Sequence, residues 1–270
     1  MNRLTAPIII IGSGRSGSTL VMRLLDRHPD IHCCGETNFL TARLWRETFE
    51  ERFWLDWERK RALNPTSRIL APDLTAEELA AVKEHVGKCV AQLVVNLLRV
   101  DAEKRWGFKE IWNGSQSFDH DWNVYDTVYP NARWLHVIRH PFSCVRSVAN
   151  WNKIPMSRNY LEWALLDWMA VQRRSMERIS TGRFIRVRYE DLSSPSTLGS
   201  ILDFAQVSSA FDVSAELTAR TMTSEDSVFP VDECVSPLSD FEGERFTELW
   251  QLMDELEYSI PDQVQVYRAQ

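Results

Sequence analysis

The sequence predicts an α/β fold in which helices cover both faces of a doubly wound parallel sheet. Short apolar runs, rich in Ile, Val and aromatic residues, alternate along the chain with longer stretches of helical periodicity. Strands that are buried on both faces are apolar throughout, as these runs are. The first run is followed at once by a glycine-rich turn and an amphipathic helix, which is a common start for a fold of this class.

Five apolar runs are expected to form the strands, at residues 7–11, 31–34, 106–111, 134–138 and 184–187. The helical stretches are 18–27, about 41–61, 75–99, 141–151, 160–179 and about 244–257. Thr75, with Glu78 three residues later, forms a capping-box pattern, and Ser194 followed by Pro195 marks another helix start. The acidic segment 224–243 is expected to form a lid or acceptor loop before the last helix.

Composition limits the class of protein. A chain of 270 residues with 44% hydrophobic and 26% charged residues is expected to fold as one domain, residues 1–270. The formal charge of −7 argues against a nucleic-acid partner. No apolar run reaches the roughly 18 residues of a transmembrane segment, and no secretory signal is recognised. Five cysteines without metal-ligand spacing favour a reducing compartment, so we expect a cytoplasmic protein without a metal site.

The turn GSGRSGSTL, at residues 12–20, is predicted to bind an anion. Gly12 and Gly17 have the separation found in the nucleotide loop GxxxxGK[ST], but Ser18 stands where that loop has its lysine. Backbone amides of residues 15–19 and the positive end of the following helix would face the anion. Arg15 adds a planar cation that can hold two oxygens, and Ser18 and Thr19 add hydroxyl groups. A Walker-type NTPase is disfavoured, because the lysine for its β and γ phosphates is missing and no Asp ends an apolar strand to hold magnesium.

The same turn resembles the first signature, [KR]SG[ST]T, of the sulfotransferases that use 3′-phosphoadenosine 5′-phosphosulfate (PAPS). The matching residues are Arg15, Ser16, Gly17, Ser18 and Thr19. The resemblance implies a P-loop NTPase-like sulfotransferase fold in which the loop, from Gly14 onward, holds the 5′-phosphosulfate. It also implies that no metal is needed and that adenosine 3′,5′-bisphosphate (PAP) is released. Local motifs are most similar to the tyrosylprotein, carbohydrate and bacterial members.

A second signature lies in RWLHVIRHPFSCVRSVANW. In the family, an arginine at the end of a strand and a serine eight residues later bind the 3′-phosphate, and Arg139 and Ser147 match them here. The segment RVRYEDL resembles a late family element and would place Tyr189 near the adenosine. WGFKEIW resembles the WGxK element, in which Lys109 would reach the transferring sulfuryl group.

Glu36 is the candidate general base. It follows the second predicted strand in HCCGET, which resembles the CGEET segment of tyrosylprotein sulfotransferases, where a glutamate is the base. Cytosolic family members use histidine instead, so His32 stays open as the base or as the partner of Glu36. His140, in the helix-opening RHP, is expected to shape the turn.

The sequence says less about the acceptor than about the donor. Trp45, Phe49, Phe53 and Trp57 form an aromatic stripe along a predicted helix, which indicates core packing or, in part, a pocket for a small-molecule, sugar or lipid-like acceptor. Many family members have a late basic loop over the cofactor, yet no lysine follows Lys153 in this chain. Either an arginine elsewhere replaces that contact, or the acidic loop faces the acceptor and selects a neutral or cationic one.

The activity expected is transfer of a sulfuryl group from PAPS to a hydroxyl, or less readily an amine, by in-line displacement. Arg15, Lys109 and Glu36 would be the catalytic residues. Two alternatives remain: a P-loop kinase-like phosphotransferase, which would need ATP and magnesium, and a catalytically silent nucleotide-binding protein.

Overall fold

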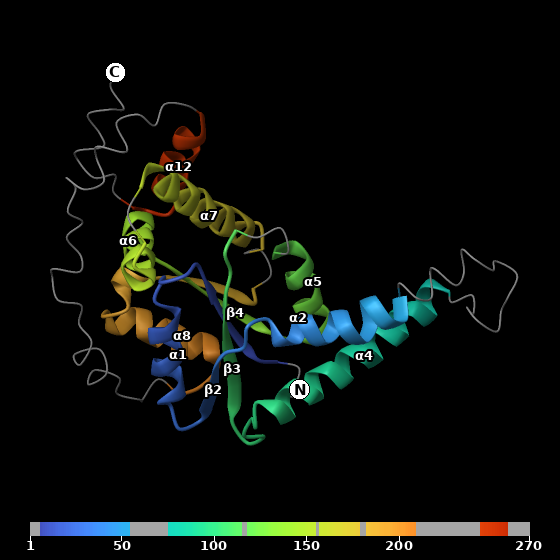
Figure 1. Cartoon of the computed structure of the whole chain (residues 1–270). Helices are drawn as coiled ribbons and strands as arrows, with labels where there is room; N and C mark the ends of the chain where they lie inside the picture. Colours follow the sequence, from blue (N-terminus) through green and yellow to red (C-terminus); the bar gives the residue numbers. More distant parts are fainter. Residues whose placement is uncertain are drawn as a thin grey trace, which may run out of the picture.

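One five-stranded parallel sheet forms the centre of the molecule, in the order β2-β3-β1-β4-β5. The computed structural model describes residues 6–54, 75–114, 118–154, 157–178, 182–208 and 244–258 (Figure 1). The strands are β1 (Ile8–Gly12), β2 (Ile31–Glu36), β3 (Arg105–Ile111), β4 (Arg133–Ile138) and β5 (Phe184–Arg188). All five predicted strands are confirmed, with ends that differ by one or two residues.

The strand order places the ends of β1 and β4 side by side at the centre of the sheet. Ile8 of β1 is in register with Gly107 of β3 on one side and with Arg133 of β4 on the other. The chain leaves β1 toward the β2 edge and leaves β4 toward the β5 edge. A crevice forms at such a switch point, beyond the carboxyl ends of the strands, and ligands of open α/β sheets bind there.

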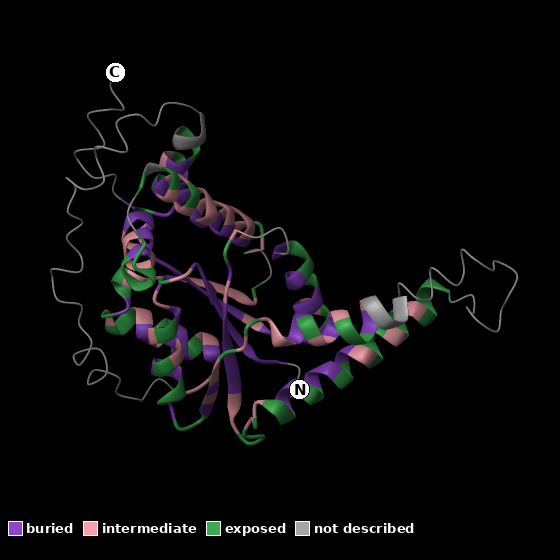
Figure 2. Cartoon of the chain, viewed as in Figure 1, coloured by how far each residue is buried: buried purple, intermediate pink, exposed green. Residues whose placement is uncertain are grey.

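Helices cover both faces of the sheet, as predicted. On one face, α1 (Ser18–Asp26) and α8 (Pro195–Ala205) pack on the even residues of β1. On the other face, α2 (Leu40–Trp45), α4 (Ala76–Leu97) and α5 (Phe118–Val128) pack on Ile9 and Ile11. A third cluster joins α6 (Pro141–Asn152), α7 (Arg158–Met176) and α12 (Glu244–Glu255). The central strands β1, β3 and β4 are buried between these layers, whereas the edge strands β2 and β5 are partly exposed (Figure 2).

The predicted helix at about 41–61 begins with α2 and continues as a π-helix over Arg46–Trp54. Trp45 and Phe49 are buried in the core, with ring centroids 4.8 Å apart, so this part of the aromatic stripe packs against the sheet. The side chain of Phe53 and the whole of Trp57 lie outside the described residues. The stripe therefore adds no described residue to a ligand pocket.

Helix α5 is absent from the prediction. Its aromatic residues Phe118, Trp122 and Tyr125 follow one another at spacings of four and three and are buried in the core. That spacing was a helical signal, but the intervening Asp, His and Asn residues are poor helix formers. Packing of the aromatic face onto the sheet overrides their low propensity.

The predicted helix ends are largely confirmed. The Thr75 hydroxyl accepts from the Glu78 amide at 3.1 Å, and the Thr75 amide donates to the Glu78 carboxylate at 2.8 Å. Ser194 precedes α8, and α12 ends two residues before the predicted position. The predicted lid at 224–243 lies outside the described residues. No helix in the described part of the chain is both long and apolar enough to cross a membrane.

Substitution of Gly107 tests how closely β3 packs against β1. A Cβ atom at this position would lie 2.5 Å from the carbonyl oxygen of Ile8 in β1, closer than atoms can approach. We expect Gly107→Ala to lower the free energy of unfolding by about 2–3 kcal/mol, since overpacking forces backbone shifts. Urea unfolding followed by circular dichroism measures the change.

Gly199 in α8 is the matched control, because a Cβ there would meet nothing within 4 Å. Gly199→Ala should raise stability by about 0.5–1 kcal/mol through helix propensity. Equal effects of the two substitutions would contradict the described packing of β1 against β3.

Candidate functional site

The loop between β1 and α1 has the form of an anion-binding turn. Gly17, the residue before α1, has φ 98°, and no side chain caps the amino-terminal amides of this helix within the described residues. These amides and the positive end of the helix dipole therefore point at the crevice beyond β1. A Cβ on Gly17 would lie 2.1 Å from the ring of Tyr189, so only glycine allows that ring to cover the loop.

Arg15 stands at the tip of the loop and faces α6. It has a positive φ of 66°, an uncommon conformation for a residue with a side chain. Its Nε donates to Ser147 Oγ at 3.1 Å, and its guanidinium lies 4.8 Å from the ring centroid of Trp151. Two residues predicted for separate phosphates, Arg15 and Ser147, are thus in direct contact.

Arg139 ties the loop to the end of β4. Only 9% of Arg139 is exposed, and its Nη1 donates to the carbonyl oxygen of Arg15 at 3.3 Å. Its guanidinium lies 4.5 Å from the ring centroid of Tyr189, which opens the short helix after β5. Trp168 of α7 donates through Nε1 to the Arg139 carbonyl at 3.2 Å. The loops after β1, β4 and β5 therefore meet at this guanidinium.

A cavity of about 400 Å³ lies over this meeting point, and we call it the arginine cavity. Its lining residues are Arg15, Arg139, Ser143, Arg146, Ser147, Asn150, Trp151 and Tyr189. The sequence analysis identified Arg15, Arg139, Ser147 and Tyr189 but missed the other four. They lie on the face of α6 that carries Ser147, so marking that helical face would have found them.

Lys109 and Glu36 form the second charged group of the site. Lys109 Nζ lies 2.7 Å from Glu36 Oε2 and donates to Thr19 Oγ1 at 3.1 Å, which joins β3 and β2 to the first turn of α1. The Lys109 side chain is 9% exposed and that of Glu36 is 38% exposed. The carboxylate is therefore open to a ligand, whereas the ammonium is largely enclosed.

A β-bulge places Glu36 beside Lys109. Cys33 is in register with Gly107, and regular pairing would bring Gly35 opposite Lys109. One extra residue in β2 makes Glu36 the partner of Lys109 instead, with Gly35 at φ 83°. When the register shifts by one residue, each following side chain of the strand points to the opposite face of the sheet. The bulge therefore turns a carboxylate toward the loop where regular pairing would leave a glycine.

Glu110 is a buried carboxylate that the sequence analysis missed. It accepts from the Thr37 hydroxyl, from the Phe39 amide at 3.0 Å and from the Tyr125 hydroxyl at 2.7 Å. Burial raises the pKa of Glu110, and the three hydrogen bonds oppose that rise. Because Thr37 directly follows Glu36, Glu110 fixes the turn behind the candidate base. A charged residue within an otherwise buried strand was the available signal.

His32 lies away from this group. It stands near the beginning of β2, and its Nδ1 accepts from the amide of Asp101 at 3.0 Å. Glu36 is at the other end of the same strand, about 13 Å away at the usual rise per residue. The geometry therefore separates His32 from both Glu36 and the loop. The His140 amide donates to Glu190 at 3.0 Å, and this bond shapes the turn after β4.

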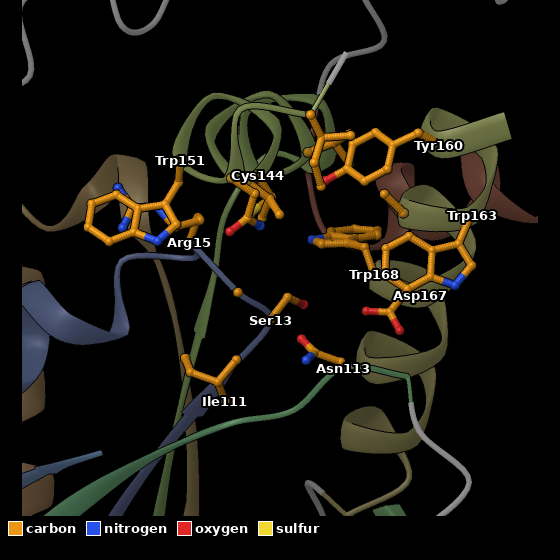
Figure 3. Close-up of a pocket in the computed structure, with 16 residues that line it drawn as sticks. Ser13, Arg15, Ile111, Asn113, Cys144, Trp151, Tyr160, Trp163, Asp167 and Trp168 are labelled. Carbon is orange, nitrogen blue, oxygen red and sulfur yellow. The ribbon is translucent and has the colours of Figure 1, made fainter. Parts of the chain in front are cut away.

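A second cavity, of about 340 Å³, lies on the other side of Arg15, between the loop, the end of β3, α6 and α7 (Figure 3). It shares Arg15 and Trp151 with the arginine cavity. We call it the aromatic cavity because Trp151, Tyr160, Trp163 and Trp168 line it. The sequence analysis did not find this cavity, since its residues come from segments far apart in the chain.

Comparison of the sequence with known proteins identifies one matching family model and a curated relative. A protein-family model described as "Sulfotransferase family" matches residues 7–211. A "Putative protein-tyrosine sulfotransferase" of Caenorhabditis briggsae is 23% identical over 190 residues, which is 68% of this chain and 59% of that protein. The chain thus spans less than two thirds of the length of this relative.

Solved structures are similar in fold. The sulfotransferase domain of the Synechococcus PCC 7002 olefin synthase has a TM-score of 0.54 at 22% identity, covering 94% of this chain and 96% of that one. A sulfotransferase from Alicyclobacillus acidocaldarius has a TM-score of 0.52 at 14% identity, covering 97% and 98%. The sulfotransferase fold that the resemblance implied, a parallel sheet with flanking helices, is thereby confirmed.

Substitution of Glu110 tests whether its hydrogen bonds hold the turn that follows Glu36. We expect Glu110→Ala to lower the free energy of unfolding by about 2–4 kcal/mol, because the partners of the carboxylate would be left buried without an acceptor. Amide hydrogen exchange at Phe39 should become faster as well. Glu84→Ala, which removes an exposed carboxylate on α4, is the control and should leave the unfolding midpoint unchanged. A stable Glu110→Ala variant with slow exchange would contradict this role.

Proposed function

Because the chain belongs to the sulfotransferase family, we propose that it transfers a sulfuryl group from PAPS to a hydroxyl group of an acceptor and releases PAP. The acceptor would be a small-molecule, sugar or lipid-like alcohol. The name of the nematode relative raises protein tyrosine as another possible acceptor. Acceptor hydroxyl and donor sulfur would react in line: the new O–S bond forms as the bond from sulfur to the bridging oxygen breaks.

The observation that carries this proposal is the pair of adjacent anion sites around Arg15. The first is the uncapped amino end of α1, which suits the 5′-phosphosulfate. The second is the arginine cavity, where Arg15, Arg139 and Arg146 accompany two serines. A nucleotide with a single phosphate chain needs only the first site. Two anion sites side by side suit a nucleotide with phosphates at both the 5′ and the 3′ positions.

Each part of PAPS can be assigned to a group of residues around the loop. We assign the 5′-phosphosulfate to the backbone of Gly14, Ser16 and Gly17 and to the hydroxyl groups of Ser18 and Thr19. Arg139 and Ser147 would hold the 3′-phosphate, and Tyr189 would lie against the adenosine. Arg146 supplies a further cation in the same cavity. It offers a replacement for the late basic loop of other family members, for which this chain has no lysine after Lys153.

Glu36 and Lys109 are assigned to the chemical step. The exposed carboxylate of Glu36 would accept the proton of the acceptor hydroxyl. Lys109, held between Glu36 and Thr19, would neutralise the negative charge that grows on the bridging oxygen, together with Arg15. The short ion pair supports this division, because the base and the cation are already adjacent to the first turn of α1.

Nucleotide preference tests the donor. We expect the purified protein to bind PAP in isothermal titration calorimetry without added metal. Arg139→Ala should weaken binding about 10- to 100-fold, because a charge-assisted contact to the 3′-phosphate is lost. Arg43→Ala removes an exposed arginine on α2 and should leave the affinity unchanged. Binding of ADP with magnesium, but not of PAP, would contradict the proposal and favour a kinase-like phosphotransferase.

The general base is tested by the rate of transfer. With PAPS as donor and a panel of phenols as acceptors, Glu36→Gln should lower kcat by about 10²- to 10⁴-fold. Its affinity for PAP should stay within about threefold of the wild type, since Glu36 does not line the arginine cavity. Glu84→Gln is the matched surface control. Full activity of Glu36→Gln together with loss of activity in His32→Asn would assign the base to the histidine. Absence of turnover in the wild-type protein would instead favour a catalytically silent nucleotide-binding protein.

A further inference from the structure

The aromatic cavity lies where an acceptor would meet the loop. Ser13, Gly14 and Arg15 form one wall, and Ile111, two residues after Lys109 on β3, lies beside them. The arginine cavity, on the other side of Arg15, contains the residues assigned to the 3′-phosphate and the adenosine of the donor. The aromatic cavity is thus adjacent to the same loop but contains neither Arg139 nor Tyr189. Its position suits the second reactant.

The walls of the aromatic cavity are largely apolar. Trp151 and Trp163 stand at its edge, 71% and 59% exposed, although large apolar side chains are usually covered. Tyr160, Val148 and Ile154 continue this lining. The volume of about 340 Å³ is at the lower end of the range for small-molecule sites. The cavity therefore suits a small ligand with an aromatic or aliphatic body.

Asp167 introduces a negative charge into this apolar lining. It comes from α7, and Figure 3 shows its carboxylate turned toward the same space as the side chains of Asn113 and Ser13. The backbone of Gly114 donates a hydrogen bond to it, and no cation within the described residues forms an ion pair with it. Burial raises the pKa of Asp167 to about 6, against that hydrogen bond, so the carboxylate is charged at neutral pH.

The other charged residue that lines the aromatic cavity, Arg15, already has contacts outside this cavity. Arg15 contacts Ser147 and Trp151 and faces the arginine cavity, where it would meet the anionic donor. With the donor bound, the charge of Arg15 is balanced by phosphate oxygens, and Asp167 is left as the unbalanced charge of the aromatic cavity. A carboxylate in apolar surroundings attracts a cation strongly, because water screens it poorly.

We propose that the aromatic cavity binds the acceptor and that Asp167 selects acceptors in which an apolar, preferably aromatic, body carries a protonated amine. The amine binds the Asp167 carboxylate, and the body packs on Trp151, Tyr160 and Trp163. The hydroxyl extends past Ile111 toward Glu36 and Lys109, where Glu36 would take its proton. Asp167 is a specificity-determining residue in this scheme. The inference rests on the proposed sulfotransferase function for the identity of the reaction, but the charge preference of the cavity is independent of it.

Three phenols of similar size and different charge test the inference: 4-(2-aminoethyl)phenol, 4-propylphenol and 3-(4-hydroxyphenyl)propanoate. Their binding to the protein, with and without PAP, is followed by quenching of tryptophan fluorescence, and kcat/KM is measured with PAPS. We expect the cation to bind at least about 10-fold more tightly than its neutral counterpart, and the anion most weakly. Asp167→Asn should lower the cation-to-neutral ratio by about 10-fold.

Asp203→Asn is the matched control, since it removes one exposed carboxylate from α8 on the opposite face of the sheet and should keep the wild-type ratio. A wild-type protein that transfers sulfate to all three phenols without charge preference would overturn the inference and leave the proposed function intact. An unchanged ratio in a folded Asp167→Asn variant would also overturn it. Cation preference that depends on Asp167, without any transfer from PAPS, would support the cavity assignment while contradicting the proposed function.

Discussion

The contact of the Arg139 guanidinium with the Arg15 carbonyl and the Tyr189 ring holds the site together. It joins the loops after β1 and β4, which flank the switch point of the sheet, to the loop after the edge strand β5. The left-handed conformations of Arg15 and Gly17 persist because this contact and the covering ring of Tyr189 restrain the loop on both sides. A preorganised loop loses less entropy when it binds an anion, so the fold prepares the anion site before any ligand arrives.

Two neighbouring carboxylates show how environment separates structural from chemical roles. Glu110 points into the core, and its hydrogen bonds to Thr37, Phe39 and Tyr125 occupy it fully. Glu36 lies beside Lys109 at the surface of the crevice, where a ligand can reach it. The bulge at Gly35 determines which residue of β2 has this position. A carboxylate available for proton transfer is thus supported by a second one that fixes the chain next to it.

Much of the fold and part of the site were predictable, because they depend on local sequence. Each strand is a short apolar run, and the glycine loop, Arg139 and Ser147 lie at recognisable spacings from strand ends. Helix α5 was missed because burial of its aromatic face outweighs a polar composition. The bulge that aligns Glu36 with Lys109, and the aromatic cavity, depend on pairing and packing between distant segments. No local pattern in one sequence encodes those contacts, and Asp167 is an ordinary helical aspartate until α7 is placed beside Gly114.

The shared wall of the two cavities has a thermodynamic consequence. Arg15 and Trp151 line both the arginine cavity and the aromatic cavity. A ligand that draws Arg15 toward one cavity therefore changes the shape and the electrostatic potential of the other. Such coupling is reciprocal: whatever factor the first ligand applies to the affinity of the second, the second applies to the first. The affinities of the two cavities are therefore coupled through the side chain of Arg15, and the cavities behave as one linked system in place of two independent sites.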